Sequence, residues 1–240
     1  CESREIYQPP ISFKVPDTPH SYSSETTGVS DEGSQSNDEK VLSILAYSEE
    51  ALKFDFWKHS YSEPYIQVRT MTGSPFNPEM PVAYAKLDFG SLVPPDMILR
   101  ALSEPEDRKA WDKDIITIER FQEISPNEHL VYSLIDFKVF FLHKRELVER
   151  HYTTFDGETA RMVYFSIDHP NYPPLPEFMR QITCFASIKI VVEEHGSTAM
   201  HFLLQFQNKK LKGTTVWQMA MKKLVGWCRA LKKNFKWCRC

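Results

Sequence analysis

The chain has 240 residues, 42% of them hydrophobic, with 16 Phe, 10 Tyr and 5 Trp, which suits one domain, or one domain plus a tail, with a substantial core. Its eight glycines form none of the patterns GxGxxG, GxxxxGK(S/T) or GxSxG, which excludes the common phosphate-binding loops and the nucleophile elbow. The formal net charge is −3, but the charges are unevenly distributed. Residues 195–240 hold 10 basic and no acidic side chains, whereas the rest of the chain holds 19 basic and 32 acidic ones. This asymmetry predicts that the C-terminal part faces an anionic surface.

Residues 1–37 are rich in Ser, Thr, Pro and acidic side chains and are expected to form a flexible tail. Asn37 or Asp38 can cap a helix over about 38–54. One side of that helix is predicted to carry Val41, Leu45, Leu52 and Phe56. Because the chain begins with Cys rather than Met, we expect it to be a fragment or a processed form.

Strands with alternating apolar residues are predicted at 66–69 and 82–87, on either side of a turn-prone segment. Two short helices follow, the first opened by Pro94-Pro95 and the second by Glu104-Pro105. The next part of the chain is predicted to be strand after strand, joined by hairpin turns. The six strand candidates lie at 114–124, 129–137, 146–155, 160–167, 180–193 and 198–206. The alternation in 180–193 predicts that Cys184 shares a face with Ala186 and Ile188.

Residues 168–179 contain too many prolines for regular structure, yet this segment is greasier than an ordinary solvent-exposed loop. Its apolar side chains are Tyr172, Leu175, Phe178 and Met179. Two interpretations remain open. The loop is either a membrane-inserting gate beside the mouth of a pocket or a segment that packs on its own domain.

A helix over about 214–236 closes the predicted fold. Its apolar positions recur at spacings of four and three: Trp217, Met221, Leu224, Cys228, Leu231 and Phe235. Basic side chains occupy the remaining positions, and those predicted to dock on a membrane are Lys222, Lys223, Arg229, Lys232 and Lys233. The pattern is typical either of a core helix with a solvated basic face or of a lid that also docks on an anionic membrane.

The five cysteines are odd in number and follow no metal-ligand spacing, so we expect neither a disulfide framework nor a metal site, in a reducing, cytosolic setting. No run of 18 apolar residues predicts a membrane span. The basic residues do not alternate with exposed stacking aromatics, which argues against nucleic acid as a partner. No cofactor is expected.

The order and spacing of several short motifs resemble a START domain, a lipid-transfer family with the helix-grip fold. The matching segments are Arg108-Lys109-Ala110-Trp111-Asp112, Leu130-Val131-Tyr132, Arg145-Glu146-Leu147-Val148, Phe165-Ser166-Ile167-Asp168-His169-Pro170, Met179-Arg180 and Lys212-Gly213. The resemblance covers about residues 38–237 and leaves 238–240 as a tail. It implies an α+β fold of the START/Bet v 1-like kind, in which a curved antiparallel sheet surrounds the long C-terminal helix and an internal hydrophobic tunnel holds one lipid. The implied gate is that helix together with the 168–179 loop.

The resemblance also implies a head-group contact. Arg108 matches the arginine that contacts phosphate in the phosphatidylcholine-transfer branch of the family. Asp112 lies four residues further on, so an ion pair within one helix is the alternative interpretation for both residues. The segment Phe165–His169 is similar to the ceramide-transfer branch, which keeps ceramide open as a ligand.

The remaining head-group candidates lie on predicted strands. The positions that cage choline in the phosphatidylcholine-transfer branch are occupied here by Ser133, Leu147 and Cys184. Glu149 and His151 share one strand face with Leu147, which makes them the best polar candidates inside the pocket.

We therefore predict a non-enzymatic protein that binds one lipid, a phospholipid with ceramide or sterol as alternatives, and transfers it between membranes. It is expected to be a cytoplasmic monomer with peripheral contact to an anionic membrane. A lipid-sensing module of a larger protein is the first alternative. A helix-grip enzyme that uses Glu149 and His151, or a basic docking protein without a lipid, are the others.

Overall fold

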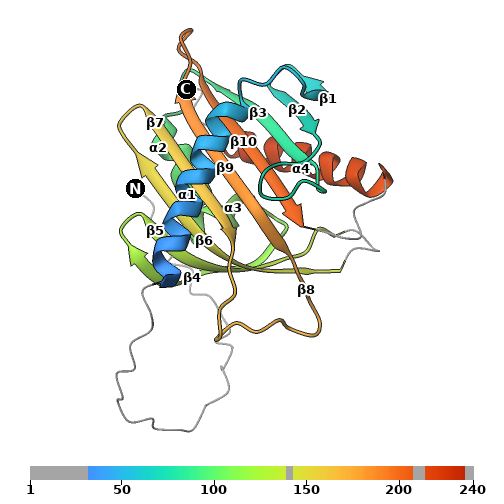
Figure 1. The fold of residues 1–240 in the computed structure, drawn as a ribbon. Coiled ribbons are helices and arrows are strands. Elements are labelled where there is room, and N and C mark those ends of the chain that lie inside the picture. The colour runs from blue at the N-terminus through green and yellow to red at the C-terminus, as the bar shows by residue number, and fades with distance from the viewer. Residues whose placement is uncertain (1–31, 139–142, 208–213, 236–240) are drawn as a thin grey trace, which may run out of the picture.

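The computed structural model describes residues 32–138, 143–207 and 214–235, with side chains from residue 37 in the first segment and from residue 217 in the last. The predicted tail at 238–240 and most of the predicted tail at 1–37 lie outside the described residues. Within these ranges the chain forms a ten-stranded sheet that carries helices on both faces (Figure 1). This confirms the predicted α+β class.

The strands are β1 (Lys58–Glu63), β2 (Ile66–Met71), β3 (Val82–Gly90), β4 (Ile115–Ser125), β5 (Glu128–Ile135), β6 (Arg145–Phe155), β7 (Thr159–Ser166), β8 (Met179–Arg180), β9 (Ile182–Val192) and β10 (Thr198–Gln207). Their order across the sheet is β1-β2-β3-β10-β9-β7-β6-β5-β4, and all these neighbours are antiparallel. The short β8 pairs with β6 in parallel. The edge strands β1 and β4 are both irregular, with register shifts in their pairing to β2 and β5.

The six predicted strands after the two short helices are confirmed, although 180–193 is divided between β8 and β9. The predicted strands at 66–69 and 82–87 are confirmed as β2 and β3. β1 was not predicted, because its sequence KHSYSE has no apolar alternation and most of its residues are exposed. Its strand conformation comes from pairing with β2 alone.

Helices cover the two faces of the sheet unequally. α1 (Glu32–Ala51) lies across one face, called the outer face below, while α2 (Pro95–Ser103), α3 (Pro105–Trp111) and α4 (Thr214–Asn234) lie on the opposite, inner face (Figure 1). α2 and α3 each begin with a proline, whose missing N–H costs no hydrogen bond in a first turn. Trp111 ties α3 back to α2 because its indole N–H donates to the Ala101 carbonyl at 2.9 Å.

The outer face is buried beneath one side of α1. Ile44 and Ala51 have no exposed surface and Val41 is 5% exposed. Ser48 is buried on the same side, where its hydroxyl donates to the Ile44 carbonyl at 2.7 Å and so avoids an unpaired buried group. The strand side chains beneath α1 are Met71, Val82, Tyr84, Val163, Phe165, Phe185 and Leu203.

The helix predicted at 38–54 is confirmed, but it begins at Glu32 and ends at Ala51. The predicted apolar side is partly wrong. Leu45 and Leu52 are half-buried, whereas Phe56 lies beyond the helix end and is 63% exposed. The buried side is centred instead on Ile44 and Ser48. A search for apolar residues misses Ser48, which can be buried because its hydroxyl is hydrogen-bonded to the Ile44 carbonyl.

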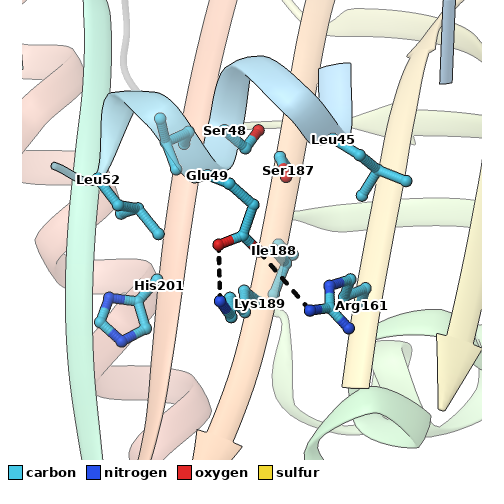
Figure 2. A pocket seen from close by; sticks show the side chains of 10 residues that line it. Leu45, Ser48, Glu49, Leu52, Arg161, Ser187, Ile188, Lys189 and His201 are labelled. Atoms are coloured by element: carbon cyan, nitrogen blue, oxygen red, sulfur yellow. Dashed lines mark hydrogen bonds and ion pairs between the residues drawn. The ribbon is translucent and has the colours of Figure 1, made fainter. Parts of the chain in front are cut away.

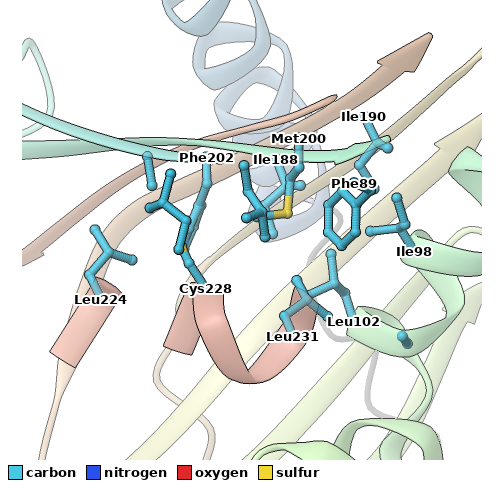
Figure 3. Close-up of a cluster of buried hydrophobic side chains, with 14 of the residues drawn as sticks. Phe89, Ile98, Leu102, Ile188, Ile190, Met200, Phe202, Leu224, Cys228 and Leu231 are labelled. Atoms are coloured by element: carbon cyan, nitrogen blue, oxygen red, sulfur yellow. The ribbon is translucent and has the colours of Figure 1, made fainter. Parts of the chain in front are cut away.

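The inner face holds the larger core, which α4 closes (Figure 3). Leu224, Cys228 and Leu231 of α4 point toward the strands, as the predicted stripe requires, and Ile98 and Leu102 of α2 close the core beside them. The strand side chains that they meet include Phe89, Ile188, Ile190, Met200 and Phe202. Burial raises the pKa of the Cys228 thiol to about 12, so this cysteine behaves as a small apolar side chain.

Cys184 does not share the face of Ala186 and Ile188. The pairing of β9 with β10 shifts between Gln205 and Phe206, so Cys184 is an extra residue on its strand. It packs against the outer-face cluster beside Phe185, whereas Ala186 and Ile188 belong to the inner core. The prediction from alternation was therefore wrong at this position, because a bulge interrupts the period of two.

We expect Ile44→Ala to lower the free energy of unfolding by about 3 kcal/mol, because the truncation leaves a cavity beneath α1. Urea denaturation followed by circular dichroism measures this change. Leu42→Ala is the matched control on the same helix, since Leu42 is 67% exposed and its truncation should cost less than about 0.5 kcal/mol. Equal losses for the two variants would contradict the packing of α1 described here.

Candidate functional site

Arg108, near the end of α3, is paired with Asp112. The Arg108 Nη2 and Asp112 Oδ2 atoms lie 2.9 Å apart, and Nε donates to the same oxygen at 3.0 Å. The indole N–H of Trp227, on α4, donates to that oxygen as well, also at 3.0 Å. The ion pair that the sequence offered as an alternative is therefore present, and Asp112 connects α3 to α4.

Two indole rings flank the Arg108 guanidinium. Its central carbon lies 4.9 Å from the ring centre of Trp111 and 5.2 Å from that of Trp227. The two rings meet edge to face, with centres 5.3 Å apart. Contacts of this kind stabilise a cation by about 1 kcal/mol each in partly buried settings. Arg108 thus has both a carboxylate and aromatic partners before any ligand is considered.

A second polar cluster lies on the inner face of β6, β7 and β9. Glu149 accepts a hydrogen bond from Thr183 Oγ1 at 2.5 Å, and its other oxygen lies 3.2 Å from His151 Nε2. The His151 ring is 5.0 Å from the ring of Tyr164. The structure thus brings together the two polar candidates that the sequence assigned to one strand face.

Tyr164 contacts this cluster and lies within electrostatic range of Arg108. Burial raises the pKa of Tyr164, the charge of Glu149 raises it further, and the nearby Arg108 acts in the opposite direction. Its phenol therefore stays protonated, and able to donate a hydrogen bond, throughout the physiological range. Because Asp112 also acts on the same phenol, the two polar groups border one region of the inner face.

Ser133 and Leu147 are direct partners across β5 and β6, so their side chains share a face. Alternation along β6 places that face on the side of Glu149 and His151. Cys184 is separated from all four, because it lies on the outer side, where the Asn77 side-chain amide donates to its sulfur at 3.8 Å. Burial raises the pKa of the Cys184 thiol as well.

The 168–179 loop contacts the outer face of the sheet. The Tyr172 ring packs on Phe121 and Tyr132, with centres 4.2 and 4.9 Å away. Its hydroxyl donates to Glu119 at 3.3 Å. Tyr132 belongs to the outer face, because it alternates with Val131 and Ser133 on β5. The structure does not bring Tyr172 to the apolar stripe of α4, which lies on the inner face.

Glu146 anchors this loop to β6. It is 1% exposed and accepts hydrogen bonds from the Tyr132 hydroxyl, the Leu175 backbone N–H and Arg180 Nε, each at 3.1 Å. The charge of Glu146 and burial raise the pKa of Tyr132, burial being the larger cause. Leu175, Phe178 and Met179, the other apolar residues of the predicted gate, are half-buried.

Three of the five cations predicted to dock on a membrane are engaged within the protein. Lys223 pairs with Asp114 at 3.2 Å, Arg229 pairs with Glu63 at 3.0 Å, and Lys232 donates to the backbone carbonyl of Asp88. The other two, Lys222 and Lys233, are exposed and have no ion pair with any residue of the described ranges.

Among the described residues, two of the hollows stand out, and neither of these two has the size and apolar lining of a lipid tunnel. One lies beneath α1, lined by Leu45, Glu49 and His201 among others, and measures only about 10 Å³, which is room for about one water molecule (Figure 2). Glu49 bridges it by pairing with Lys189 and Arg161 (Figure 2). The other, of about 460 Å³, opens between α2, α3 and β4 and is lined largely by charged side chains.

The described residues hold no group of three or more His, Cys, Asp or Glu side chains arranged for a metal ion. No helix among them is long and apolar enough to cross a membrane.

Sequence reasoning missed four inner-face residues: Trp227, Tyr164, Thr183 and Arg145. Trp227 lies three residues after Leu224 and four before Leu231, so a wider stripe on the helix would have included it. Tyr164 pairs with His151 across the β6–β7 hairpin. Thr183 reaches Glu149 from β9, 34 residues further along the chain, which no local pattern reveals.

A family model described as START domain matches residues 44–234 of the chain. Among solved structures, human StAR-related lipid transfer protein 5 superposes with a TM-score of 0.69 at 16% identity, covering 85% of this chain and 95% of that one. Human STARD10 superposes with a TM-score of 0.64 at 17% identity, covering 87% and 80%. The human StarD13 (DLC2) lipid transfer and protein localization domain gives 0.61 at 15% identity, covering 88% and 98%. No curated protein matches the sequence. The structural likenesses show the helix-grip fold.

We expect Asp112→Asn to lower the free energy of unfolding by about 3 kcal/mol, because it leaves the partly buried Arg108 without its carboxylate and weakens the contact to Trp227. Asp114→Asn is the matched control, since its pair with Lys223 is more exposed and should contribute less than about 1 kcal/mol. Thermal denaturation measures both. An unchanged stability in Asp112→Asn would mean that this carboxylate does not hold α3 and α4 together.

Proposed function

This chain belongs to the START domain family, and from that premise we propose that it binds one lipid on the inner face of its sheet and transfers it between membranes without covalent chemistry. The observation that carries the proposal is α4, an amphipathic helix whose apolar stripe covers the apolar inner face. Two of the similar structures are lipid-transfer proteins by name, which supports a lipid as the ligand class.

The physical task of such a protein is to keep an acyl chain away from water. Each CH₂ group exposed to water costs about 0.8 kcal/mol, so one sixteen-carbon chain costs about 12 kcal/mol. An inner face built from side chains such as Ile188, Met200 and Phe202 removes most of that cost. No bond has to be made or broken, so no catalytic group is needed.

The burial of α4 supports a helix that opens at one end. Cys228 and Leu231, in its C-terminal half, have no exposed surface, whereas Trp217 and Met221 in its N-terminal half are half-buried. Less apolar surface is lost when the N-terminal half moves away from the sheet than when the whole helix leaves. In our proposal this half is the door through which the lipid enters the space between α4 and the sheet.

The 168–179 loop is the second moving part in this proposal. It is fastened at Glu146, which holds the Leu175 backbone and Arg180, and at Tyr172, which packs on the outer face. Release of these contacts would free Met179 at the edge of the inner face, beside the first residue of β6. Gating then depends on the loop and on α4 together.

We propose a phospholipid as the ligand, with ceramide and sterol as the alternatives. Candidate head-group contacts are Arg108, Asp112, Ser133, Leu147, Glu149 and His151, which share the inner face. Tyr164, whose phenol pKa is raised by burial, adds a hydrogen-bond donor beside them. Cys184 is left out of this group because it faces α1.

Docking to an anionic membrane follows from the same helix. The exposed Lys222 and Lys233 are available in the closed state, and a basic side chain near an anionic bilayer contributes about 1 kcal/mol. Lys223, Arg229 and Lys232 would join them once opening breaks their contacts with the rest of the protein. We propose a cytoplasmic monomer that touches the membrane only at its periphery.

Met221→Trp should lower lipid uptake at least tenfold, because the larger side chain fills the space that the lipid would occupy between α4 and the sheet. The measurement is uptake of a fluorescent phospholipid from phosphatidylcholine vesicles, with bound lipid identified by native mass spectrometry. Gln218→Trp is the matched control on the exposed side of the same helix and should behave as the original protein. Normal uptake by Met221→Trp would show that the lipid does not lie beneath α4.

The same assay separates a carrier from a sensor. A carrier should move the fluorescent lipid from donor to acceptor vesicles and exchange its bound lipid many times. A protein that holds one lipid without exchange, at one lipid per chain, would contradict transfer and support a sensing module. An empty protein that takes up no offered lipid would contradict both.

A further inference from the structure

Arg145, the first residue of β6, is buried on the inner face. Alternation along the strand puts it on the side of Leu147, Glu149 and His151 and opposite to Glu146 and Arg150. The contact of Arg150 with Asp38 of α1 identifies that opposite side as the outer face. Arg145 is only 6% exposed, so its guanidinium lies in the interior on the α4 side of the sheet.

Within the described ranges, this guanidinium has no anionic partner. Its Nε atom has no hydrogen-bond partner, and its only polar contact is from Nη1 to the thioether sulfur of Met179. A thioether is a weak acceptor and carries no charge. Burial without a counter-ion also lowers the pKa of Arg145.

A second buried arginine, Arg150, differs from Arg145 in having carboxylate partners. Arg150 is 4% exposed and is paired with two carboxylates, Glu128 and Asp38. Glu146, the next residue in the sequence, does not form an ion pair with Arg145, because its carboxylate lies on the other face of the sheet and is paired with Arg180. Arg145 is therefore a buried cation whose counter-charge the described protein does not supply.

We propose that Arg145 binds the phosphate of the phospholipid, and that it does so in place of Arg108. This rests on the proposed function of lipid binding on the inner face. The planar guanidinium presents several N–H donors in a fixed fork, which matches two oxygens of a phosphate. Arg108 is less available because Asp112 and two indole rings already hold it.

The position of Arg145 suits a lipid head group that enters beneath the N-terminal half of α4. Arg145 pairs with Ile135 at the end of β5. Two residues further on, the Phe137 ring lies 5.8 Å from Lys223 Nζ of α4. Lys223 also pairs with Asp114, beside the start of β4. Arg145 therefore lies at the end of the sheet that the middle of α4 reaches.

Met179 connects this cation to the proposed gate. It is the last residue of the 168–179 loop segment and pairs with Arg145 through β8. Its thioether is the group that a phosphate would replace at Nη1. Ser133, one pair further along β5 and β6 on the same face, adds a hydroxyl within the same region.

The test is Arg145→Met, which keeps the volume of the side chain and removes the charge. Two fluorescent probes are offered in phosphatidylcholine vesicles: NBD-labelled phosphatidic acid, which carries the phosphate, and NBD-labelled ceramide, which does not. We expect uptake of the phosphatidic acid to fall at least tenfold, or about 1.4 kcal/mol in binding, while uptake of ceramide stays unchanged. Equal uptake of phosphatidic acid by the variant and the original protein would overturn the inference.

Two further variants distinguish a loss of lipid binding from a loss of folding. Arg145→Met should unfold at the same or a higher temperature than the original protein, because it removes an unpaired buried charge, whereas Arg150→Met should unfold at a lower one because Glu128 loses its partner. If Arg145→Met does not fold, Arg145→Lys decides, since it keeps the charge and loses the fork. A lower ratio of phosphatidic acid to ceramide uptake in Arg145→Lys supports the inference, and an unchanged ratio overturns it.

The remaining outcomes distinguish the two proposals. Uptake of both probes that does not depend on Arg145 overturns this inference and leaves the proposed function standing. If the original protein takes up neither probe, the proposed function fails and the inference fails with it. If inorganic phosphate binds at Arg145 in calorimetry but does not compete with the labelled phosphatidic acid, the site is one for free phosphate, and the assignment to a lipid head group is overturned.

Discussion

The polar contact between α3 and α4 depends on one carboxylate. Asp112 ends α3 and accepts hydrogen bonds from Arg108 on its own helix and from Trp227 on α4. Few side chains offer enough lone pairs to receive both donors while almost fully buried. Through this contact α4 is held against α3 as well as against the apolar strands. Trp227 also flanks the Arg108 guanidinium, so a movement of α4 away from α3 would remove one of the groups that surround this arginine.

The two faces of the sheet are suited to different tasks. Beneath α1 the packing leaves about 10 Å³, and the cation-lined gap there is bridged by Glu49. The buried Arg150 on that side is paired with two carboxylates, although the buried Tyr47 hydroxyl there has no hydrogen-bond partner among the described residues. The inner face instead combines a half-buried stretch of α4 with the Glu149 cluster and an arginine that lacks a carboxylate.

Most elements could be predicted from the sequence because their signals are local. Prolines marked α2 and α3, alternation marked most strands, and the spacing of apolar residues marked α4. The pair of Arg108 and Asp112 was visible as a possibility for the same reason, since the residues are one helical turn apart. Cys184 was misplaced because a bulge changes the facing of a residue without changing its type. Arg145 was overlooked because the absence of a partner is a property of the assembled sheet.

The position of β10 has a consequence for how the chain folds. The last strand pairs with β3 on one side and β9 on the other, so it is the strand through which β1–β3 join the rest of the sheet. During synthesis, β3 and β9 each present an unpaired edge until the ribosome has released residues near 200. Contacts between residues so far apart in the sequence form slowly, because the chain loses conformational entropy in closing the long loop before the contacts stabilise it. The nascent chain therefore passes through a stage with two open sheet edges, when protection by a chaperone matters most.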